Sequence, residues 1–536
     1  MTTAAPPVAG ILVAFTAIFS GCDSGGSTTS TVAVDDLLDA QAGRQMYREG
    51  ILPSGEPMTA IVAGDVPVLG TQFSCESCHG RSGMGAAEGD YIVPPIAGQF
   101  LFAPSPQPAR PAYTQDSFAQ LLRNGVTPGG RILSELMPRY KLTDDEVAAM
   151  MVYLAGLSSA LSPGVDDKFI RFAAVITDDV AAEEREAVLA VLNTFVEEKN
   201  RNTRLESERW DRGNTPQSRL PTVHRDWVLE EWALSGPSET WNEQLERRYR
   251  DAPVFAMLSG LSNSSWGPIS RFCERNEVPC LFPSTDLTDA GNGDFYTLYY
   301  SRGLELEADL IASHLADHPV SNVVQVYCGD SPAQAATHLR TKLELSDAMV
   351  RDVEFDCDDG PPIKDVAGYM AADQGAALIL WLNREHAASI SEELPDARMY
   401  FSSTLLGNEL GGPFSAVSGP AFVAHPFRLP GHVDPAFARF RVWAKTRGIE
   451  LTSPRRQSEA FFACLAMKDT IAHIGRFFIR DFALDTLDHA QSIVAYLPFY
   501  PRPTLGPHQR FVNKGGYVLP IVDGQPDQKG AAWILP

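Results

Sequence analysis

Apolar residues follow two different rhythms along the chain. Up to residue 158 they recur at helical spacings, as in residues 147–154, which the capping sequence Thr143-Asp144-Asp145-Glu146 opens. Residues 158–164 break this pattern. From residue 168 onward, short apolar runs alternate with helical stretches, and these runs are 172–176, 254–258, 281–282, 323–327, 377–381 and 399–401.

Strands that alternate with helices are typical of parallel α/β sheets. The helix expected after the first strand has Val188, Val191, Leu192, Phe195 and Val196 on one face. The length of this part calls for two lobes. A chain of 536 residues agrees with this organisation, since about three domains of roughly 100–200 residues are expected for it.

Composition excludes several classes of protein. Lys and Arg total 44 against 67 Asp and Glu, and the resulting charge of −23 repels the phosphate backbone, so we expect no nucleic acid partner. A hydrophobic content of 44% excludes a disordered or collagen-like chain. No predicted strand is followed by G-x-x-x-x-G-K-[ST] or G-x-G-x-x-G, so nucleotide chemistry has no support.

The N-terminus predicts export and anchoring. Residues 8–19 form an apolar run too short to span a bilayer but of the right length for a signal peptide. The run ends in Phe19-Ser20-Gly21-Cys22, which resembles a bacterial lipobox with Phe19 in place of Leu, and a Gly/Ser/Thr-rich tether follows. We expect a lipid on Cys22 and a location in the periplasm, held to a membrane by that lipid alone. An ordinary buried Cys22 is the alternative.

The strongest chemical signal is Cys75-Glu76-Ser77-Cys78-His79. In a C-x-x-C-H sequence the two thiols form thioethers to haem and the adjacent imidazole binds the iron. Half of a zinc site would need a second Cys/His pair, and none follows in the next hundred residues. A thioredoxin-type redox pair would need a preceding strand and a following helix, but the surroundings are rich in Ser and Gly. We therefore expect covalent haem c.

Around this motif, residues 36–158 resemble a class I cytochrome c, which implies a small all-helical domain. Gly43 and Tyr47 lie four apart, as in the family's first helix, which crosses the last one closely at its glycine. In Val93-Pro94-Pro95-Ile96, a carbonyl of Pro94 or Pro95 would orient the haem histidine. Met137, in a Met-Pro before the last helix, is the expected sixth ligand.

A methionine in a protein is more often core filler than a metal ligand. Four other methionines could therefore bind the iron in place of Met137. The rivals are Met58, Met84, Met150 and Met151. A His/Met site leaves no position open on the iron, so it implies single-electron transfer and no enzymatic activity or catalytic residue.

Residues 168–536 resemble the type I periplasmic binding proteins, the fold of branched-chain amino-acid receptors. In that family two loops at strand ends bind the ligand's carboxylate, and the residues expected to do so here are Ser259, Ser262, Ser264, Ser265, Ser284 and Thr285. Residues 295–301 and 303–314 resemble the crossover into the second lobe, and Asp523-Gly524 resembles the closing hairpin. The same Ser and Thr residues could instead serve only as caps and turn formers.

The second lobe would complete the ligand site with Tyr327, Trp381, Asn383 and Thr404. Amino-acid receptors carry a carboxylate near the position of Thr404 to meet the ligand's ammonium, and none is present in the local sequence. A buried ammonium without a counter-charge is costly. We therefore expect a small polar or carboxylate ligand that is not an α-amino acid.

The remaining cysteines and histidines carry weaker signals. Cys273 with Cys280 and Cys328 with Cys357 are candidate disulfides, because covalent haem implies an oxidising compartment. Cys464 is expected in a core, and His425 on the surface.

Together these signals predict residues 1–21 as signal peptide, 22–35 as tether, 36–158 as cytochrome c domain, 159–167 as linker and 168–536 as binding-protein-like domain. The first functional hypothesis is a tethered periplasmic cytochrome with an unknown redox partner protein and a fused ligand-binding module. The alternative is a solute receptor whose haem domain is a redox sensor or docking accessory.

Overall fold

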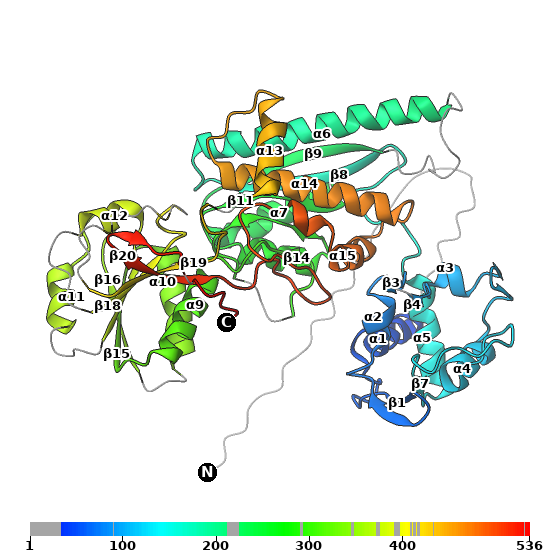
Figure 1. The fold of residues 1–536 in the computed structure, drawn as a ribbon. Helices are drawn as coiled ribbons and strands as arrows, with labels where there is room; N and C mark the ends of the chain where they lie inside the picture. The colour runs from blue at the N-terminus through cyan, green and yellow to red at the C-terminus, as the bar shows by residue number, and fades with distance from the viewer. Residues whose placement is uncertain are drawn as a thin grey trace, which may run out of the picture.

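The computed structural model describes residues 34–88, 91–211, 225–289, 293–344, 348–370, 376–390, 397–407, 410, 414, 419–431, 434–529 and 531–536. An N-terminal domain and two α/β lobes can be distinguished in Figure 1. The expected signal peptide and Cys22 lie outside the described residues. Within the described ranges, no helix combines the length and the apolar character that a membrane span requires.

The N-terminal domain is built around two helices that cross at a glycine. Its helices are α1 (Val34–Glu49), α2 (Cys75–His79), α3 (Gly98–Leu101), α4 (Gln115–Asn124) and α5 (Asp144–Gly156). A Cβ added to Gly43 of α1 would lie 2.3 Å from the carbonyl oxygen of Ala149 in α5, so only glycine permits this approach. The buried ring of Tyr47 packs 5.4 Å from that of Tyr153. The close crossing expected from Gly43 and Tyr47 is confirmed.

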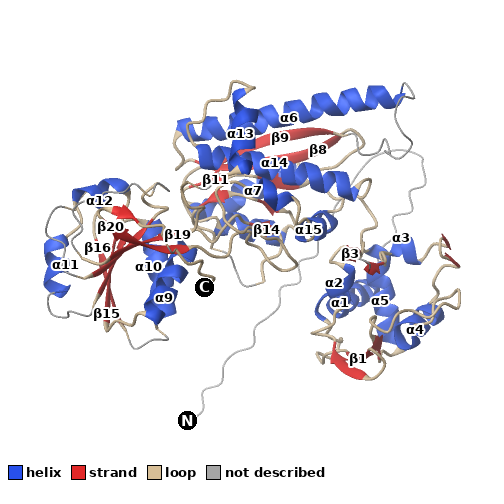
Figure 2. Ribbon diagram, viewed as in Figure 1, coloured by secondary structure: helices blue, strands red, loops and turns tan. Residues whose placement is uncertain are grey.

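This domain is not all-helical, which corrects one prediction. It also contains β1 (Thr59–Val62), β2 (Val66–Leu69), β3 (Ala86–Glu88), β4 (Tyr91–Val93), β5 (Ser105–Pro106), β6 (Ala109–Arg110) and β7 (Arg139–Tyr140). β1 pairs antiparallel with both β2 and β7. The hairpin forms because two short, mostly β-branched apolar runs flank a turn in which Ala63 and Gly64 have positive φ. Figure 2 shows β1 and β3 at opposite ends of the domain.

The first lobe is a seven-stranded parallel sheet covered by helices. Its strands are β8 (Phe169–Thr177), β9 (Asp226–Leu234), β10 (Ala256–Leu258), β11 (Leu261–Ser262), β12 (Cys280–Leu281), β13 (Ser284–Thr285) and β14 (Thr297–Leu298). Its helices are α6 (Ala182–Asp211), α7 (Trp241–Asp251), α8 (Gly267–Arg275), α13 (Pro435–Lys445), α14 (Pro454–Ile474) and α15 (Arg480–Asp488), with 3₁₀ turns at Ser238–Thr240 and Ile493–Tyr496. The apolar face predicted for α6, which includes Val188 and Leu192, is buried against this sheet.

Two central strands of this sheet are kinked rather than ended. Ser259 (φ 60°) separates β10 from β11, and Phe282 (φ 59°) separates β12 from β13. β10 and β11 both pair with β8, so the chain resumes the same sheet after the kink. The polar loops predicted after β10 and β12 therefore begin only after the short strands β11 and β13.

The second lobe is a seven-stranded sheet in the order β16-β15-β17-β18-β19-β20-β21. Its elements are α9 (Leu304–Asp317), β15 (Asn322–Tyr327), α10 (Asp330–Leu343), β16 (Met349–Glu354), α11 (Ile363–Met370), β17 (Ala377–Trp381), α12 (Arg384–Ser389), β18 (Arg398–Ser402), β19 (Ala421–His425), β20 (Tyr517–Val522) and β21 (Gln525–Pro526). The strands β15 to β19 are parallel, and β20 and β21 are antiparallel. The expected hairpin at Asp523-Gly524 joins β20 and β21, and α9 starts the second lobe as predicted.

Candidate functional site

The C-x-x-C-H motif forms the short helix α2. Ser74 caps it, because its Oγ accepts the backbone N–H of Ser77 at 3.3 Å. Cys75 and Cys78 are both free thiols; Cys78 is exposed, and burial raises the pKa of Cys75 to about 12. Neither thiol forms a disulfide, so both can form the two thioether bonds that the motif predicts.

His79 is oriented by the carbonyl group predicted to do so. Its Nδ1 lies 3.0 Å from the carbonyl oxygen of Pro94, which can only accept, so Nδ1 carries the proton and donates it there. The other nitrogen, Nε2, is left as the ligand atom. Burial lowers the pKa of His79, which favours the neutral imidazole that binds metals. Pro95 makes no such bond and only lines the adjoining cavity.

His79 and Met137 line one cavity of about 360 Å³. The rivals Met58, Met84, Met150 and Met151 are not among the residues that line it, and Met58 and Met150 are buried in the domain core. The cavity therefore contains the two side chains predicted as axial ligands.

Two residues that sequence reasoning missed also shape this cavity. Arg139 holds the loop that carries Met137, because its guanidinium donates to the carbonyls of Met137 at 2.6 Å and of Leu133 at 2.9 Å. Arg110 lines the cavity wall and donates to the carbonyl of Leu101 at 3.2 Å, with no carboxylate bonded to it among the described residues. Arg110 also bonds the carbonyls of Phe100, Ala103 and Pro111, so it fixes this loop and brings a positive charge to the cavity wall. The set of thiols, imidazole, thioether and guanidinium fits covalently bound haem.

The second candidate site is the group of polar loops at the strand ends of the α/β part. Ser262 bonds within its own turn, since its Oγ donates to the carbonyl of Ser264 at 3.0 Å. Ser264 donates to Asp179 at 2.6 Å, and Ser265 accepts from the N–H of Gly267 at 3.2 Å. Ser259 is buried with its hydroxyl unpaired among the described residues. Ser262 and Ser265 therefore form turns, the alternative that the sequence left open, whereas the Ser264 hydroxyl bonds a carboxylate 85 positions away.

The other predicted loop is bound to α14. Ser284 donates its hydroxyl to the fully buried Glu459, and Tyr500 donates to the same carboxylate at 2.7 Å. Thr285 bonds only within its turn, to the backbone of Leu287 at 3.1 Å. Sequence reasoning missed Glu459, because a helix residue 175 positions away in the chain leaves no local signal.

Arg455 of α14 holds a carboxylate in this loop. Its two terminal nitrogens bond the two oxygens of Asp286 at 3.0 and 2.8 Å. Burial raises the pKa of Asp286, but the charges of Arg455 and Arg456 outweigh burial and hold the pKa below its usual range. The pair has the bidentate geometry by which arginine binds carboxylates.

The structure corrects the premise drawn from Thr404. Glu307 of α9 accepts the backbone N–H of Thr404 at 3.0 Å and its hydroxyl at 2.8 Å, so a carboxylate does lie at this position. It comes from a distant segment and was invisible in the local sequence. Burial raises the pKa of Glu307 to about 7, and one of its oxygens has no partner among the described residues.

The remaining predicted ligand residues have internal partners. Tyr327 donates to Asp352 at 3.3 Å, the Trp381 indole donates to Gln325 at 2.9 Å, and Asn383 caps α12 by accepting the N–H of His386. The prediction that His425 lies on the surface is wrong. His425 ends a central strand and is buried, and its Nδ1 lies 3.0 Å from the Ser403 hydroxyl.

Only one of the two candidate disulfides is present. Cys328 and Cys357 are bonded and close a separation of 29 residues. Cys273 and Cys280 are free thiols packed in the core of the first lobe, where Cys273 Sγ lies 3.5 Å from Met257 Sδ and the Trp266 indole donates to Cys280. The second pairing was therefore wrong. Cys464 is buried, as predicted.

Residues 70–158 match the family model of cytochrome c. This part of the chain is a cytochrome c domain. A cytochrome c domain with this motif carries covalently bound haem c and its iron, in agreement with the donor set described above. The helix α1 precedes the matched residues but packs on α5, which lies within them.

The α/β part is similar to solved substrate-binding proteins. A leucine-binding protein from Thermotoga maritima shares 13% identity and covers 68% of this chain and 99% of its own, with a TM-score of 0.44. A branched-chain amino-acid transporter protein from Thermus thermophilus with bound valine shares 9% identity over 68% of this chain and 96% of its own, with a TM-score of 0.47. A search of curated proteins finds no match.

The cytochrome c domain is docked on the first lobe through α15. Asp485 accepts the backbone N–H groups of Arg81 at 3.1 Å and Ser82 at 2.9 Å, directly after the haem motif. A Cβ on Gly80 would lie 2.6 Å from the Asp485 carboxylate. Burial raises the pKa of Asp485 to about 6, in spite of these hydrogen bonds.

Proposed function

We propose that this protein is a periplasmic c-type cytochrome that carries single electrons and is fused to a small-molecule-binding module. The observation that carries the proposal is the bond between His79 Nδ1 and the Pro94 carbonyl, because it leaves Nε2 as the iron ligand beside the two free thiols. Haem c bound there supplies a reversible one-electron couple.

The chain's own side chains support an electron carrier rather than an enzyme. His79 and Met137 would occupy both axial positions and so exclude water and oxygen from the iron. Arg139 holds the carbonyl of Met137 and so keeps the thioether in place. We propose no catalytic residue.

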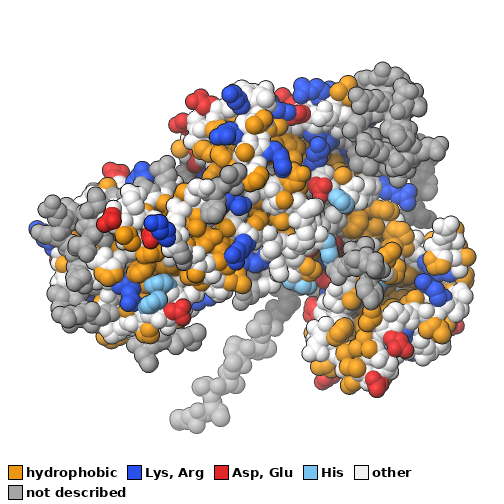
Figure 3. All heavy atoms as spheres, in the orientation of Figure 1, with side chains coloured by type: hydrophobic (Ala, Val, Ile, Leu, Met, Phe, Trp, Pro, Cys, Tyr) orange, Lys and Arg blue, Asp and Glu red, His pale blue; other side chains and the backbone are white. Residues whose placement is uncertain are grey.

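A protein redox partner has an apolar surface to approach. The loop that leads to Met137 exposes Ile132, which is 74% accessible, and Leu136, which is 57% accessible. Figure 3 shows apolar side chains on the visible face of this domain. Exposed apolar patches mark contact surfaces for other proteins, so we place the electron-transfer contact here.

The binding module would take a small polar or carboxylate ligand in the cleft between its lobes. The Asp286–Arg455 pair supports this, because a ligand carboxylate could replace Asp286 on the same guanidinium. The carboxylate of Glu307 at Thr404 could meet a cationic group of the ligand, and the ammonium of an α-amino acid is such a group.

A solute receptor with haem as its redox sensor is the second candidate. The observation that favours it is Asp485, which joins the binding module to the loop after the haem histidine by two partly buried hydrogen bonds. In a sensor, ligand binding shifts the haem potential; in a carrier with an independent module it does not.

Substitution of Met137 tests the haem assignment. In the full chain, Met137→Ala should abolish the methionine-to-iron absorption band of the oxidised protein and lower its reduction potential. Met84→Ala is the control, since Met84 does not line the haem cavity. A band that survives in Met137→Ala would overturn the assignment.

A titration of the haem potential separates the two candidates. The potential is measured in the full chain with and without the ligand that calorimetry identifies from a panel of carboxylates, amides and amino acids. A shift on binding supports the sensor, and an unchanged potential supports the carrier.

A further inference from the structure

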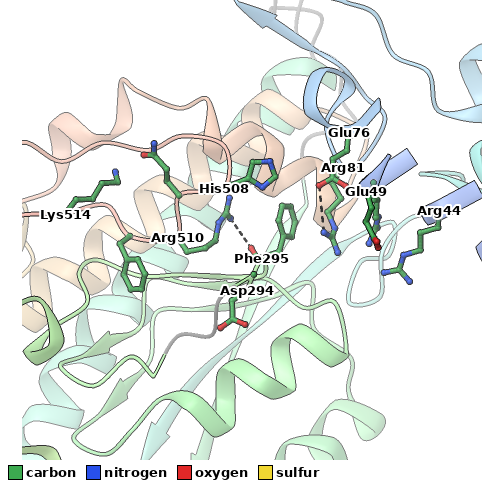
Figure 4. A pocket seen from close by; sticks show the side chains of 13 residues that line it. Arg44, Glu49, Glu76, Arg81, Asp294, Phe295, His508, Arg510 and Lys514 are labelled. Carbon is green, nitrogen blue, oxygen red and sulfur yellow. Dashed lines mark hydrogen bonds and ion pairs between the residues drawn. The ribbon is translucent and has the colours of Figure 1, made fainter. Parts of the chain in front are cut away.

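A cavity of about 710 Å³ opens between the cytochrome c domain and the first lobe. Arg48, Glu76 and Arg81 line it from the haem side, and Phe295 and Arg510 line it from the other. Figure 4 shows Phe295 between the guanidinium groups of Arg81 and Arg510. The cavity lies next to the haem motif, whose Glu76 is part of its lining.

Its lining is rich in positive charge although the chain as a whole is strongly acidic. The lining contains Arg44, Arg48, Arg81, Arg510 and Lys514, against Glu49, Glu76 and Asp294. Burial lowers the pKa of His508 in this wall, and the charges of Arg510 and Arg81 lower it further. Basic side chains thus outnumber acidic ones among the residues that line the cavity.

Several of these cations are already paired with acids. Arg44 bonds Glu277 at 2.9 Å, and Arg510 bonds both oxygens of Asp488. Within the described residues, Lys514 bonds only the carbonyl and hydroxyl of Thr504, which are neutral groups. Arg48 bonds Asp481 at 3.3 Å. Within the described residues, Arg81 and Lys514 are therefore the two cations of the lining without a hydrogen-bonded carboxylate.

Arg81 is the clearest of these. Its side chain is 16% exposed, but its guanidinium donates no hydrogen bond within the described residues, and the nearest carboxylate oxygens, on Asp481 and Glu76, are 3.8 and 4.0 Å away. Its Nε is buried and has no hydrogen-bond acceptor in the part of the chain that the structure describes. The group lies 4.1 Å from the Phe295 ring centre, which holds it in place without satisfying its N–H groups. A mostly buried guanidinium with unsatisfied donors is costly unless an anion binds it.

We propose that this interdomain cavity binds a small dianion, such as a dicarboxylate or inorganic phosphate, with Arg81 as its anchor. Two acidic groups match the two cations of the lining, Arg81 and Lys514, that bond no carboxylate within the described residues. Both kinds of anion present the paired oxygens that a guanidinium binds in bidentate fashion.

The site would report to the haem. Arg81 follows the axial histidine by two residues, so a bound anion stabilises the oxidised iron, which carries one more positive charge. By linkage, the oxidised protein then binds the anion more tightly than the reduced protein. Each tenfold difference in affinity equals a fall of about 59 mV in the one-electron potential.

Calorimetry and redox titration of the full chain test the proposal. Succinate and inorganic phosphate are titrated separately at low salt into oxidised protein, and the stronger binder identifies the type of anion. Arg81→Gln should weaken binding at least tenfold and abolish the potential shift, while Arg81→Lys should restore part of it. Lys514→Gln is a second variant on the other wall and should weaken binding less.

Arg439→Gln is the matched control. Arg439 also stacks on an aromatic ring, 4.3 Å from the centre of Tyr496, but it does not line the cavity. Binding by this variant should equal that of the unchanged protein. The proposal is overturned if neither anion binds at millimolar concentration, or if Arg81→Gln binds as well as Arg439→Gln does.

Discussion

Replacing Gly43 by alanine should destabilise the cytochrome c domain at the crossing of α1 and α5. The new Cβ would lie 2.3 Å from the Ala149 carbonyl oxygen and 2.6 Å from Tyr153 Cβ. Both atoms belong to, or are fixed by, the backbone of α5, so the two helices must separate. Overpacking of this kind costs about 1–3 kcal/mol. The better helix propensity of alanine returns about 0.5–1 kcal/mol, so a net loss of roughly 1–2 kcal/mol is expected.

The matched control is Gly156→Ala, at the end of α5. A Cβ there meets nothing within 4 Å, so only the propensity gain remains. Denaturant unfolding of the full oxidised chain, followed by the methionine-to-iron band, reports on this domain alone, whereas a global signal would mix three bodies. We expect the midpoint to fall for Gly43→Ala and to stay or rise slightly for Gly156→Ala. Equal midpoints for the two variants would refute the close crossing.

Three further predictions each concern a single residue. Between about pH 4 and 6 the unfolded chain ionises Asp485 while the folded chain keeps it protonated, so the free energy of unfolding falls by up to about 3 kcal/mol as pH rises through this window. Asp485→Asn should remove this pH dependence when unfolding is measured at pH 4 and 7. An unaltered dependence in the variant would contradict the prediction. Cys328→Ser should cost the second lobe about 2–4 kcal/mol in denaturant unfolding, and a reductant should then have no further effect on the variant, unlike on the unchanged protein. Cys22→Ser should release the protein from membranes in fractionation, and a mature N-terminus other than Cys22 in mass spectrometry would contradict lipidation.

The haem ligands were predictable because their signal is local. Cys75, Cys78 and His79 are contiguous, and the Pro94 carbonyl follows within a short loop, so type and spacing alone define the chemistry. The alternation of strands and helices likewise predicted two parallel sheets, because each element shows its own period. The β1–β2 hairpin was missed since its strands are short and one edge is solvent-exposed.

The polar contacts of the binding module were not predictable. Asp286 and Arg455 are 169 positions apart, and Glu307 reaches Thr404 across 97 positions. The local sequences around Asp286, Arg455 and Glu307 look the same as those around charged residues on a solvated surface. Only the fold pairs them, so a carboxylate was expected to be absent where one is present.

The same limit applies to the contact between the domains, and here it bears on function. Arg455 and Glu459 at the start of α14 hold the Ser284–Asp286 loop, and α15, which follows α14 and packs on it, bonds the haem loop through Asp485. One stretch of chain therefore touches the candidate ligand cleft at one end and the loop after the axial histidine at the other. A ligand carboxylate that displaces Asp286 from Arg455 changes the charge at the first end. Contiguity alone is no proof of coupling, because the element must also have two arrangements that both sites bias. The Asp485→Asn variant supplies that test: a ligand-induced shift of the haem potential that disappears in it runs through α15, and a shift that persists does not.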